Sequence, residues 1–345
     1  VLSDKNYLIF CDIFSIACLL ISVVGSVGNV VSIKVFISMG LRDGVTTSFV
    51  FLVTADLIYL VVMAAHAVAL QLFVIEKKSQ YRTWFNVDPF GVYIVFANIA
   101  NLIYFETITI TTMLAVVRCM CVAMPLKFKN VFNRGTSSVA SFVFCVLGLA
   151  SYLPVLVYMA LIPGYDPRVN ATRSVLWISP QREESKHAVW ITRDVSFTFA
   201  SEVVVIVCVI VMARRIRAAS RFRQMSTLNG LNKPESITRK GPSTKTSQKN
   251  ARLRQNLSKT SNRELSVVKQ VVLISTVYIV SNAPKIVFVI VSFFYTEFTL
   301  GKSYQNLYLV GVSSMEFFQT CSSSINIFIY YKFNTKFRKY CTLRK

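Results

Sequence analysis

The stretch 46–74 reads TTSFVFLVTADLIYLVVMAAHAVALQLFV and decides the fold class. It is 29 residues long with one formal charge, Asp56, and about 20 apolar residues of helix cross the hydrocarbon core of a bilayer. Six further stretches have this length and character. The sequence therefore predicts an all-α membrane protein, a bundle of seven transmembrane helices in one domain over 1–345. The expected spans are 8–36, 46–74, 91–123, 138–162, 189–213, 265–294 and 304–331.

Composition excludes several classes of protein. The chain has 345 residues, 54% of them hydrophobic, with a mean hydropathy of +0.52 and 16% charged, against about 25% charged in soluble domains. A net charge of +22 would suggest nucleic acid if it were spread over a soluble surface, but fourteen Lys and Arg are concentrated in 214–263. No nucleic-acid partner is expected. With two His and no phosphate-binding or metal-binding motif, an enzyme is not expected either.

The basic residues also predict the orientation. One set of loops carries 25 Lys and Arg against two acids, and the other carries nine against seven. Because basic loops stay in the cytoplasm, the N-terminus is expected outside and the tail inside, as an odd number of spans requires. Asn170, in an Asn-Ala-Thr sequon of an outer loop, is a candidate glycosylation site. Asn256, in the inner basic segment, is expected to stay unmodified.

Two segments on the expected cytoplasmic side differ from the spans in composition. Residues 218–263 are basic, rich in Ser and Thr and without apolar periodicity, so a disordered cytoplasmic loop is expected there. Residues 332–345 place aromatic residues at helical spacing among Lys and Arg, which predicts a short amphipathic eighth helix on the membrane surface. Cys341 follows it and is either palmitoylated or a free thiol.

Motifs within the spans resemble those of the rhodopsin-like G-protein-coupled receptor family. They occur in the expected order along nearly the whole chain: Gly28-Asn29, Leu52-Val53-Thr54-Ala55-Asp56-Leu57, Val117-Arg118-Cys119, Pro125-Leu126, Pro284 and Asn326-Ile327-Phe328-Ile329-Tyr330. Within the family, the run from Val116 to Asn130 is most similar to chemosensory receptors of gastropod molluscs. The resemblance implies a receptor for an extracellular small ligand, a waterborne chemical cue, that activates a heterotrimeric G protein at the plasma membrane.

The chain also departs from the family pattern. Val117 replaces the acid of the Asp-Arg-Tyr triplet, Cys119 replaces its Tyr, and Asn282 replaces the Trp expected two residues before Pro284. No Cys lies where the family's outer disulfide would form, so the outer loop 163–188 is expected to have no disulfide bridge to the bundle. The fifth span also lacks its proline. These departures indicate a divergent receptor.

The resemblance assigns the activation switch to the inner ends of the spans. Arg118 is expected to pair with an acid in the inactive state, and Glu264 is the candidate partner because Val117 is not one. The alternative is that Arg118 extends to lipid phosphates. Leu126 would insert into the G protein, Pro284 would kink the moving sixth helix, and Asn326 and Tyr330 belong to the seventh-span switch motif.

Asp56 is a polar group in mid-span, where an unpaired charge is costly. A network of oxygen and amide groups is expected around it, formed with Asn29, Thr107, Ser322, Ser323 and Asn326. Such a set suits a sodium ion. The alternative is a closed hydrogen-bond network that holds the helices together. No other cofactor is expected.

The ligand is expected between the outer halves of the spans. Lys285 and Glu316 should project into this space, where they either pair with each other or bind a zwitterion such as an amino acid. The remaining candidates for the cavity wall are His66, Asn98, Asn101, Tyr104 and Gln319. Ala100 replaces the Asp of amine receptors, and 304–331 contains no Lys for retinal, so both ligands are disfavoured.

Two alternatives remain open. The chain could be a neuropeptide receptor of the same family, or a membrane channel or transporter. The odd span count and the absence of internal repeats in the sequence disfavour a transporter. Membrane lipids, arrestin and receptor kinases are further partners implied by the resemblance.

Overall fold

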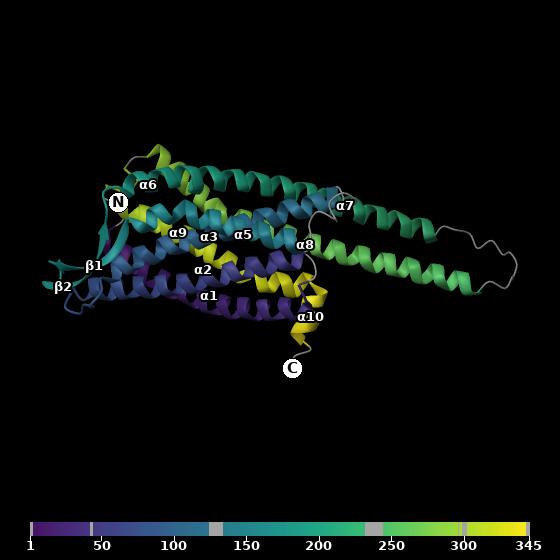
Figure 1. Cartoon of the computed structure of the whole chain (residues 1–345), viewed down its shortest axis with the longest axis horizontal. Coiled ribbons are helices and arrows are strands. Elements are labelled where there is room, and N and C mark those ends of the chain that lie inside the picture. Colours follow the sequence, from purple (N-terminus) through teal and green to yellow (C-terminus); the bar gives the residue numbers. More distant parts are fainter. Residues whose placement is uncertain are drawn as a thin grey trace.

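Long helices run side by side along the molecule and form a single elongated bundle (Figure 1). The computed structural model describes residues 3–41, 44–123, 134–231, 244–295, 297–298 and 302–342, and of residues 134, 183, 187, 216, 219–231 and 244–265 it describes the backbone alone. The elements in chain order are α1 Asp4–Met39, α2 Gly44–Lys78, α3 Pro89–Ala123, α5 Arg134–Val157, β1 Met159–Asp166, β2 Ala171–Ile178, α6 Arg182–Val189, the π-helix η1 Trp190–Phe197, α7 Thr198–Leu231, α8 Thr244–Phe294, α9 Gln305–Phe333 and α10 Thr335–Thr342.

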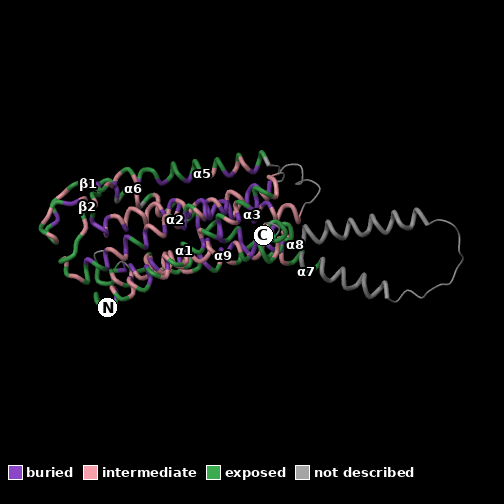
Figure 2. Tube along the Cα trace, turned by 90° about the horizontal axis from the view of Figure 1, so that it is seen from below, coloured by how far each residue is buried: buried purple, intermediate pink, exposed green. Residues whose placement is uncertain are grey.

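Local chemistry explains the first helix. Ser3 caps α1 by accepting a hydrogen bond from the backbone N–H of Asn6, and α1 ends at Gly40, whose φ of 84° suits a residue without a side chain. Along α1, Leu20 and Val24 are 62% and 69% exposed although they are apolar. Figure 2 shows buried and exposed residues alternating along the helices. An apolar exposed stripe of this kind faces lipid.

Seven helices form the bundle. In the described part of the chain, six are long and apolar enough to cross a membrane by length and composition. The seventh, α9, has 29 residues but carries Ser, Thr, Asn and Gln along one side, which lowers its hydropathy. It packs against α1, α2 and α8. The predicted seven-helix bundle is thus confirmed, and its polar seventh member owes its place to neighbouring helices rather than to lipid.

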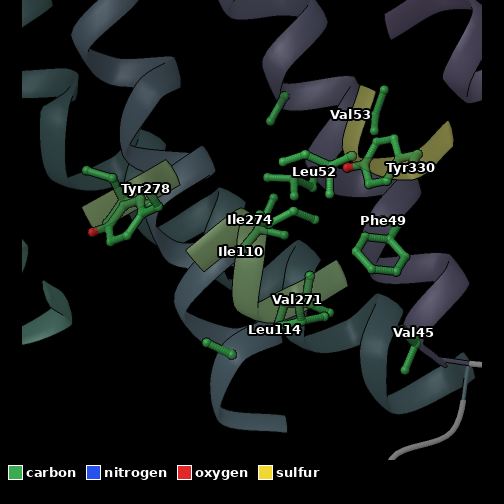
Figure 3. Close-up of a cluster of buried hydrophobic side chains, with 14 of the residues drawn as sticks. Val45, Phe49, Leu52, Val53, Ile110, Leu114, Val271, Ile274, Tyr278 and Tyr330 are labelled. Atoms are coloured by element: carbon green, nitrogen blue, oxygen red, sulfur yellow. The ribbon is translucent and has the colours of Figure 1, made fainter. Parts of the chain in front are cut away.

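The main hydrophobic core, part of which Figure 3 shows, includes side chains of α1, α2, α3, α7, α8, α9 and α10. Phe49, Tyr330 and Phe36 form a cluster with ring centroids 5.0–5.7 Å apart. Phe337 of α10 is fully buried and packs on Phe36 at 5.2 Å. The eighth helix predicted from the sequence is therefore present as α10 and is anchored by an aromatic side chain.

Two predicted boundaries were wrong. The fourth helix ends at Val157 rather than at 162, because the chain turns into β1, and a short apolar run fits a strand as well as a helix. The segment 218–263, expected to be disordered, is helical up to Leu231 and again from Thr244, with 232–243 outside the described residues. Ala, Arg, Gln and Leu favour helix there even without apolar periodicity.

A β-hairpin lies at the end of the bundle opposite α10 (Figure 1). β1 and β2 pair antiparallel, with Ile162 opposite Val175 and Asp166 opposite Ala171. Beyond the hairpin, Asp88 donates its backbone N–H to Ser174 at 2.8 Å, and Ser174 donates to Asn86 at 3.1 Å. The hairpin is thus attached to the chain just before α3.

Candidate functional site

A cavity of about 420 Å³ lies in the half of the bundle next to the hairpin, between α2, α3, α5, α6, η1, α8 and α9. Leu176 and Ile178 of β2 also line it, so the hairpin contributes to its wall. This volume is in the range of sites for small molecules. Five predicted ligand residues line it: Asn98, Asn101, Lys285, Glu316 and Gln319.

His66 and Tyr104 were wrong as wall residues and lie behind the cavity. His66 is fully buried and packs against Tyr93 with the two rings tilted and their centroids 4.5 Å apart. Tyr104 packs against Tyr59, which does line the cavity, at 5.3 Å. Helical spacing placed both side chains on the inner face, but aromatic neighbours stand between them and the open space.

The cationic wall differs from the expected arrangement. The Lys285 ammonium is 3.8 Å from Asp194 of η1, so the alternative in which Lys285 pairs with Glu316 was wrong. Asp194 also accepts a hydrogen bond from Asn101 at 3.3 Å. An ion pair of 3.8 Å is longer than a charge-assisted hydrogen bond, which leaves the ammonium protons available.

Arg182 of α6 is a cavity residue that the sequence analysis missed. Its side chain is buried, and its guanidinium donates to the side-chain oxygen of Asn98 at 3.0 Å. Tyr152 donates to the same oxygen at 3.0 Å. Arg182 was overlooked because it precedes the expected fifth span by seven residues. In the structure it is the first residue of α6, and its side chain lines the cavity.

The anionic wall is formed by α9. Glu316 is 12% exposed at its side chain, and its Oε2 has no hydrogen-bond partner in the described part of the chain. The imidazole Nε2 of His66 lies 3.7 Å from this oxygen. Tyr59 donates to Gln319, one turn further along α9, at 3.4 Å. The cavity thus separates cations on one wall from a carboxylate on the other.

The π-helix η1 positions Asp194 beside a second missed residue, Arg193. The Arg193 guanidinium stacks on Phe105 and Tyr152, at 4.2 and 4.5 Å from the ring centroids. It also donates to the backbone carbonyls of Asn101 and Leu102. Charged residues inside an expected span were the signal for both Arg193 and Asp194. Arg193 joins η1 to α3, while Asp194 faces the cavity.

A buried ionic hub holds the hairpin in place, and the loop 163–188 has no disulfide, as expected from the sequence. Arg173 of β2 bonds Glu76 of α2 at 2.6 Å, Asp88 at 3.3 Å and Asp166 of β1 at 2.7 Å. Arg168 also bonds Asp166, at 2.8 Å. Hydrogen bonds from Arg168, with help from Arg173, hold the pKa of Asp166 well below its usual range. All eight cysteines are free, and ionic bonds secure this loop.

Beneath the cavity, a polar network links four helices at mid-span. Thr107 and Asn326 donate to the two carboxylate oxygens of Asp56, at 3.2 and 2.8 Å. Asn29 donates to the backbone carbonyl of Ser323 at 3.1 Å. Ser322 is half-buried and takes no part in these three hydrogen bonds. The structure thus brings together most of the residues that the motifs singled out.

At the inner end, Arg118 is half-buried near the end of α3. The side chain of Glu264 and all of Leu126 lie outside the described residues, so their roles stay predictions. Pro284 lies inside α8, where it removes one backbone hydrogen bond. Tyr330 is fully buried in the aromatic cluster.

Two candidate modification sites lie at opposite ends of the molecule. Asn170 is exposed in the turn between β1 and β2, and accepts a hydrogen bond from Tyr165 at 2.6 Å. Cys341 of α10 is half-buried and packs against the main core.

Comparison with known proteins identifies the architecture. Neither a protein-family model nor a curated protein sequence matches the chain. Among solved structures, the crystal structure of squid rhodopsin matches with a TM-score of 0.61 and 14% identity, over 99% of this chain and 86% of that one. The chain has a rhodopsin-like seven-helix fold. In this fold the cavity, the Asp56 network and Arg118 follow one another from the hairpin end toward the α10 end.

Proposed function

We propose that the protein is a G-protein-coupled receptor of the plasma membrane, with its N-terminus outside. The observation that carries the proposal is a cavity with charged walls in the hairpin half of a rhodopsin-like bundle, with the Asp56 network and Arg118 further along the same helices. A ligand bound there would shift the equilibrium between two helix arrangements, with Pro284 as the kink in α8. Opening at the inner end would admit a heterotrimeric G protein to Arg118 and Leu126.

The ligand is a small extracellular molecule, a waterborne chemical cue of the kind that gastropod chemosensory receptors detect. A cavity of about 420 Å³, partly covered by the hairpin, favours a small molecule over the alternative of a neuropeptide. The charged groups lie on separate walls of a closed bundle and do not follow a path along it, which favours a receptor over a channel or transporter.

Sodium is the one ion we propose, at Asp56. Buried oxygen ligands suit it: the side-chain oxygen of Asn29 is fully buried without a hydrogen-bond partner among the described residues, and Ser323 and Thr107 lie in the same network. A bound cation would hold the helices in the inactive arrangement. Basal nucleotide exchange should then be lower in sodium than in potassium for the wild type, and equal in both salts for Asp56→Asn.

Further partners follow from the same proposal. Basic helix ends would contact membrane lipids, Cys341 would carry a palmitoyl group, and Asn170 would carry a glycan. Ser and Thr of the basic segment would be phosphorylated by receptor kinases and then bound by arrestin. Mass spectrometry of the protein from animal cells tests directly whether Cys341 carries a palmitoyl group and Asn170 a glycan.

The test of the main proposal is nucleotide exchange on a panel of G proteins, measured with the receptor in membranes. Arg118→Ala should abolish receptor-dependent exchange, basal and stimulated by a pool of amino acids, peptides and waterborne odorants. Arg82→Ala, an exposed basic residue of an outer loop, is the matched control and should behave as wild type. Exchange that survives Arg118→Ala, or an ion current without G protein, would overturn the proposal.

A further inference from the structure

We propose that the cavity binds a small zwitterion in one orientation, with its carboxylate against Arg182 and Lys285 and its ammonium group against Glu316. This inference rests on the proposed receptor function and names the ligand class of its cavity. It is carried by buried ionic groups whose bonds within the protein are incomplete, and which line one space from the separate helices α6, α8 and α9.

Arg182 and Lys285 lie on the same side of the cavity because each is linked to α3, either directly or through another side chain. Arg182 bonds Asn98, while Lys285 reaches Asn101 through Asp194. Asn98 and Asn101 are three residues apart on a helix, so they are neighbours on one face. The two cations therefore converge on a single turn of α3.

Both cations have donors to spare. Arg182 is 4% exposed, and its Nε has no hydrogen-bond partner among the residues that the structure describes. Lys285 is 8% exposed and lies 3.8 Å from a single carboxylate oxygen. Buried donors without acceptors are costly, and a ligand carboxylate would accept from both.

Glu316 lacks a hydrogen-bond donor, whereas the two cations lack acceptors. Its Oε2 is buried without a donor in the described part of the chain, and His66 at 3.7 Å is beyond hydrogen-bond distance. A ligand ammonium group would supply the missing donors. An anionic ligand would leave Glu316 unpaired, and a cationic one would leave Arg182 and Lys285 unsatisfied. A ligand with both groups satisfies both walls.

The rest of the cavity limits the ligand's size and favours an apolar middle. Leu176 and Ile178 cover it from the hairpin, and aromatic side chains form the walls between the charged groups. These are Tyr59, Tyr93, Trp190, Phe288 and Tyr308. A single amino acid, of the α type or with its two charges at the ends of a short chain, fits this description.

The first experiment compares ligands on the purified wild-type receptor in nanodiscs, without G protein. The probes are the common α-amino acids and straight-chain amino acids from glycine to 6-aminohexanoate. Each is paired with the amine that lacks its carboxylate and the acid that lacks its ammonium. Binding is measured as a rise in melting temperature with ligand concentration. At least one amino acid should bind at least about tenfold tighter than both of its singly charged partners.

Variants then assign each end of the ligand. Glu316→Gln should weaken the best amino acid by about tenfold or more while leaving its ammonium-free partner unchanged. Arg182→Gln should weaken the amino acid and spare its carboxylate-free partner. Glu297→Gln, an exposed acid near the same end of the bundle, should change neither.

The proposal is overturned if singly charged partners bind as tightly as the amino acids, or if no amino acid stabilises the wild type at millimolar concentration. It is also overturned if Glu316→Gln weakens both members of a pair equally. If a variant does not fold, the comparison of probes on the wild type still decides. Basal nucleotide exchange, which needs no ligand, tests the receptor function separately.

Discussion

Two sets of buried charges in the hairpin half of the molecule differ in how completely they are bonded. In the hub around Arg173, the guanidinium bonds three carboxylates, and Glu76 also accepts from the backbone N–H of Phe85 at 3.1 Å. In the cavity, Glu316 and Arg182 each keep a buried atom without a hydrogen-bond partner among the described residues. Burial is similar in the two sets, and the completeness of bonding separates them.

This difference distinguishes a structural role from a binding role. A hub whose charges are all bonded has no site for a ligand, and its function is to hold β1 and β2 over the cavity, where the family pattern would place a disulfide. Groups that are buried and incompletely bonded destabilise the free protein, and such a cost is expected where a ligand supplies the missing bonds. The predictions below test this contrast, from the largest expected effect to the smallest.

Replacing Arg173 should have the largest effect. Arg173→Gln would leave Glu76, Asp88 and Asp166 together without their central cation, and breaking a buried ionic group in this way costs about 3–5 kcal/mol. Thermal unfolding of the receptor in nanodiscs should show a large fall in melting temperature. Arg82→Gln is the control, and a fall no larger than in this control would contradict the structural role of the hub.

A Glu→Gln substitution in the hub and another in the cavity compare the two sets of buried charges directly. Glu76→Gln should lower the free energy of unfolding by about 3 kcal/mol, because it removes one arm of the hub. Glu316→Gln should cause no loss, since it removes a buried charge whose Oε2 has no hydrogen-bond donor in the described part of the chain. Melting temperatures of both variants without ligand are the measurement. Equal losses in the two variants would remove the contrast.

Acid should weaken the hub only at low pH. Because the pKa of Asp166 is lowered in the folded protein, its contribution is complete above the ordinary pKa of about 3.9 and is lost as pH falls toward the folded value. Asp166→Asn should cost about 2 kcal/mol at pH 7, as expected for hydrogen bonds to a charged group. The difference in melting temperature between wild type and variant should stay constant from pH 7 to about pH 5 and shrink below about pH 4. A difference that closes between pH 7 and 5 would show that another group controls the hairpin.

Arg168 should matter least. Its side chain is 38% exposed, and exposed ion pairs contribute about 0–1 kcal/mol. Arg168→Gln should therefore lower the melting temperature slightly, and high salt should reduce the difference. A salt-independent effect as large as that of Arg173→Gln would place Arg168 in the structural part of the hub.

Features that follow from the bilayer could be predicted from the sequence. The spans were recognised by length, and Asp56 and Lys285 were singled out because a polar group in mid-span needs a reason. The hairpin was missed because the apolar run after Val157 fits helix and strand equally. Arg182 was missed because it lies outside the apolar spans, where a basic residue is ordinarily solvated.

The sequence by itself determined that seven helices cross a membrane and that charges lie within the bundle, because length and hydropathy are properties of each segment alone. Only the tertiary structure decided which charges meet: Arg173 with acids from three segments, Lys285 with Asp194, and Glu316 with neither Lys285 nor Arg182. Pairing depends on the rotation and register of neighbouring helices, which local periodicity leaves open. The absence of a disulfide at the hairpin followed from the positions of the cysteines in the sequence, and only the tertiary structure showed that salt bridges hold the hairpin.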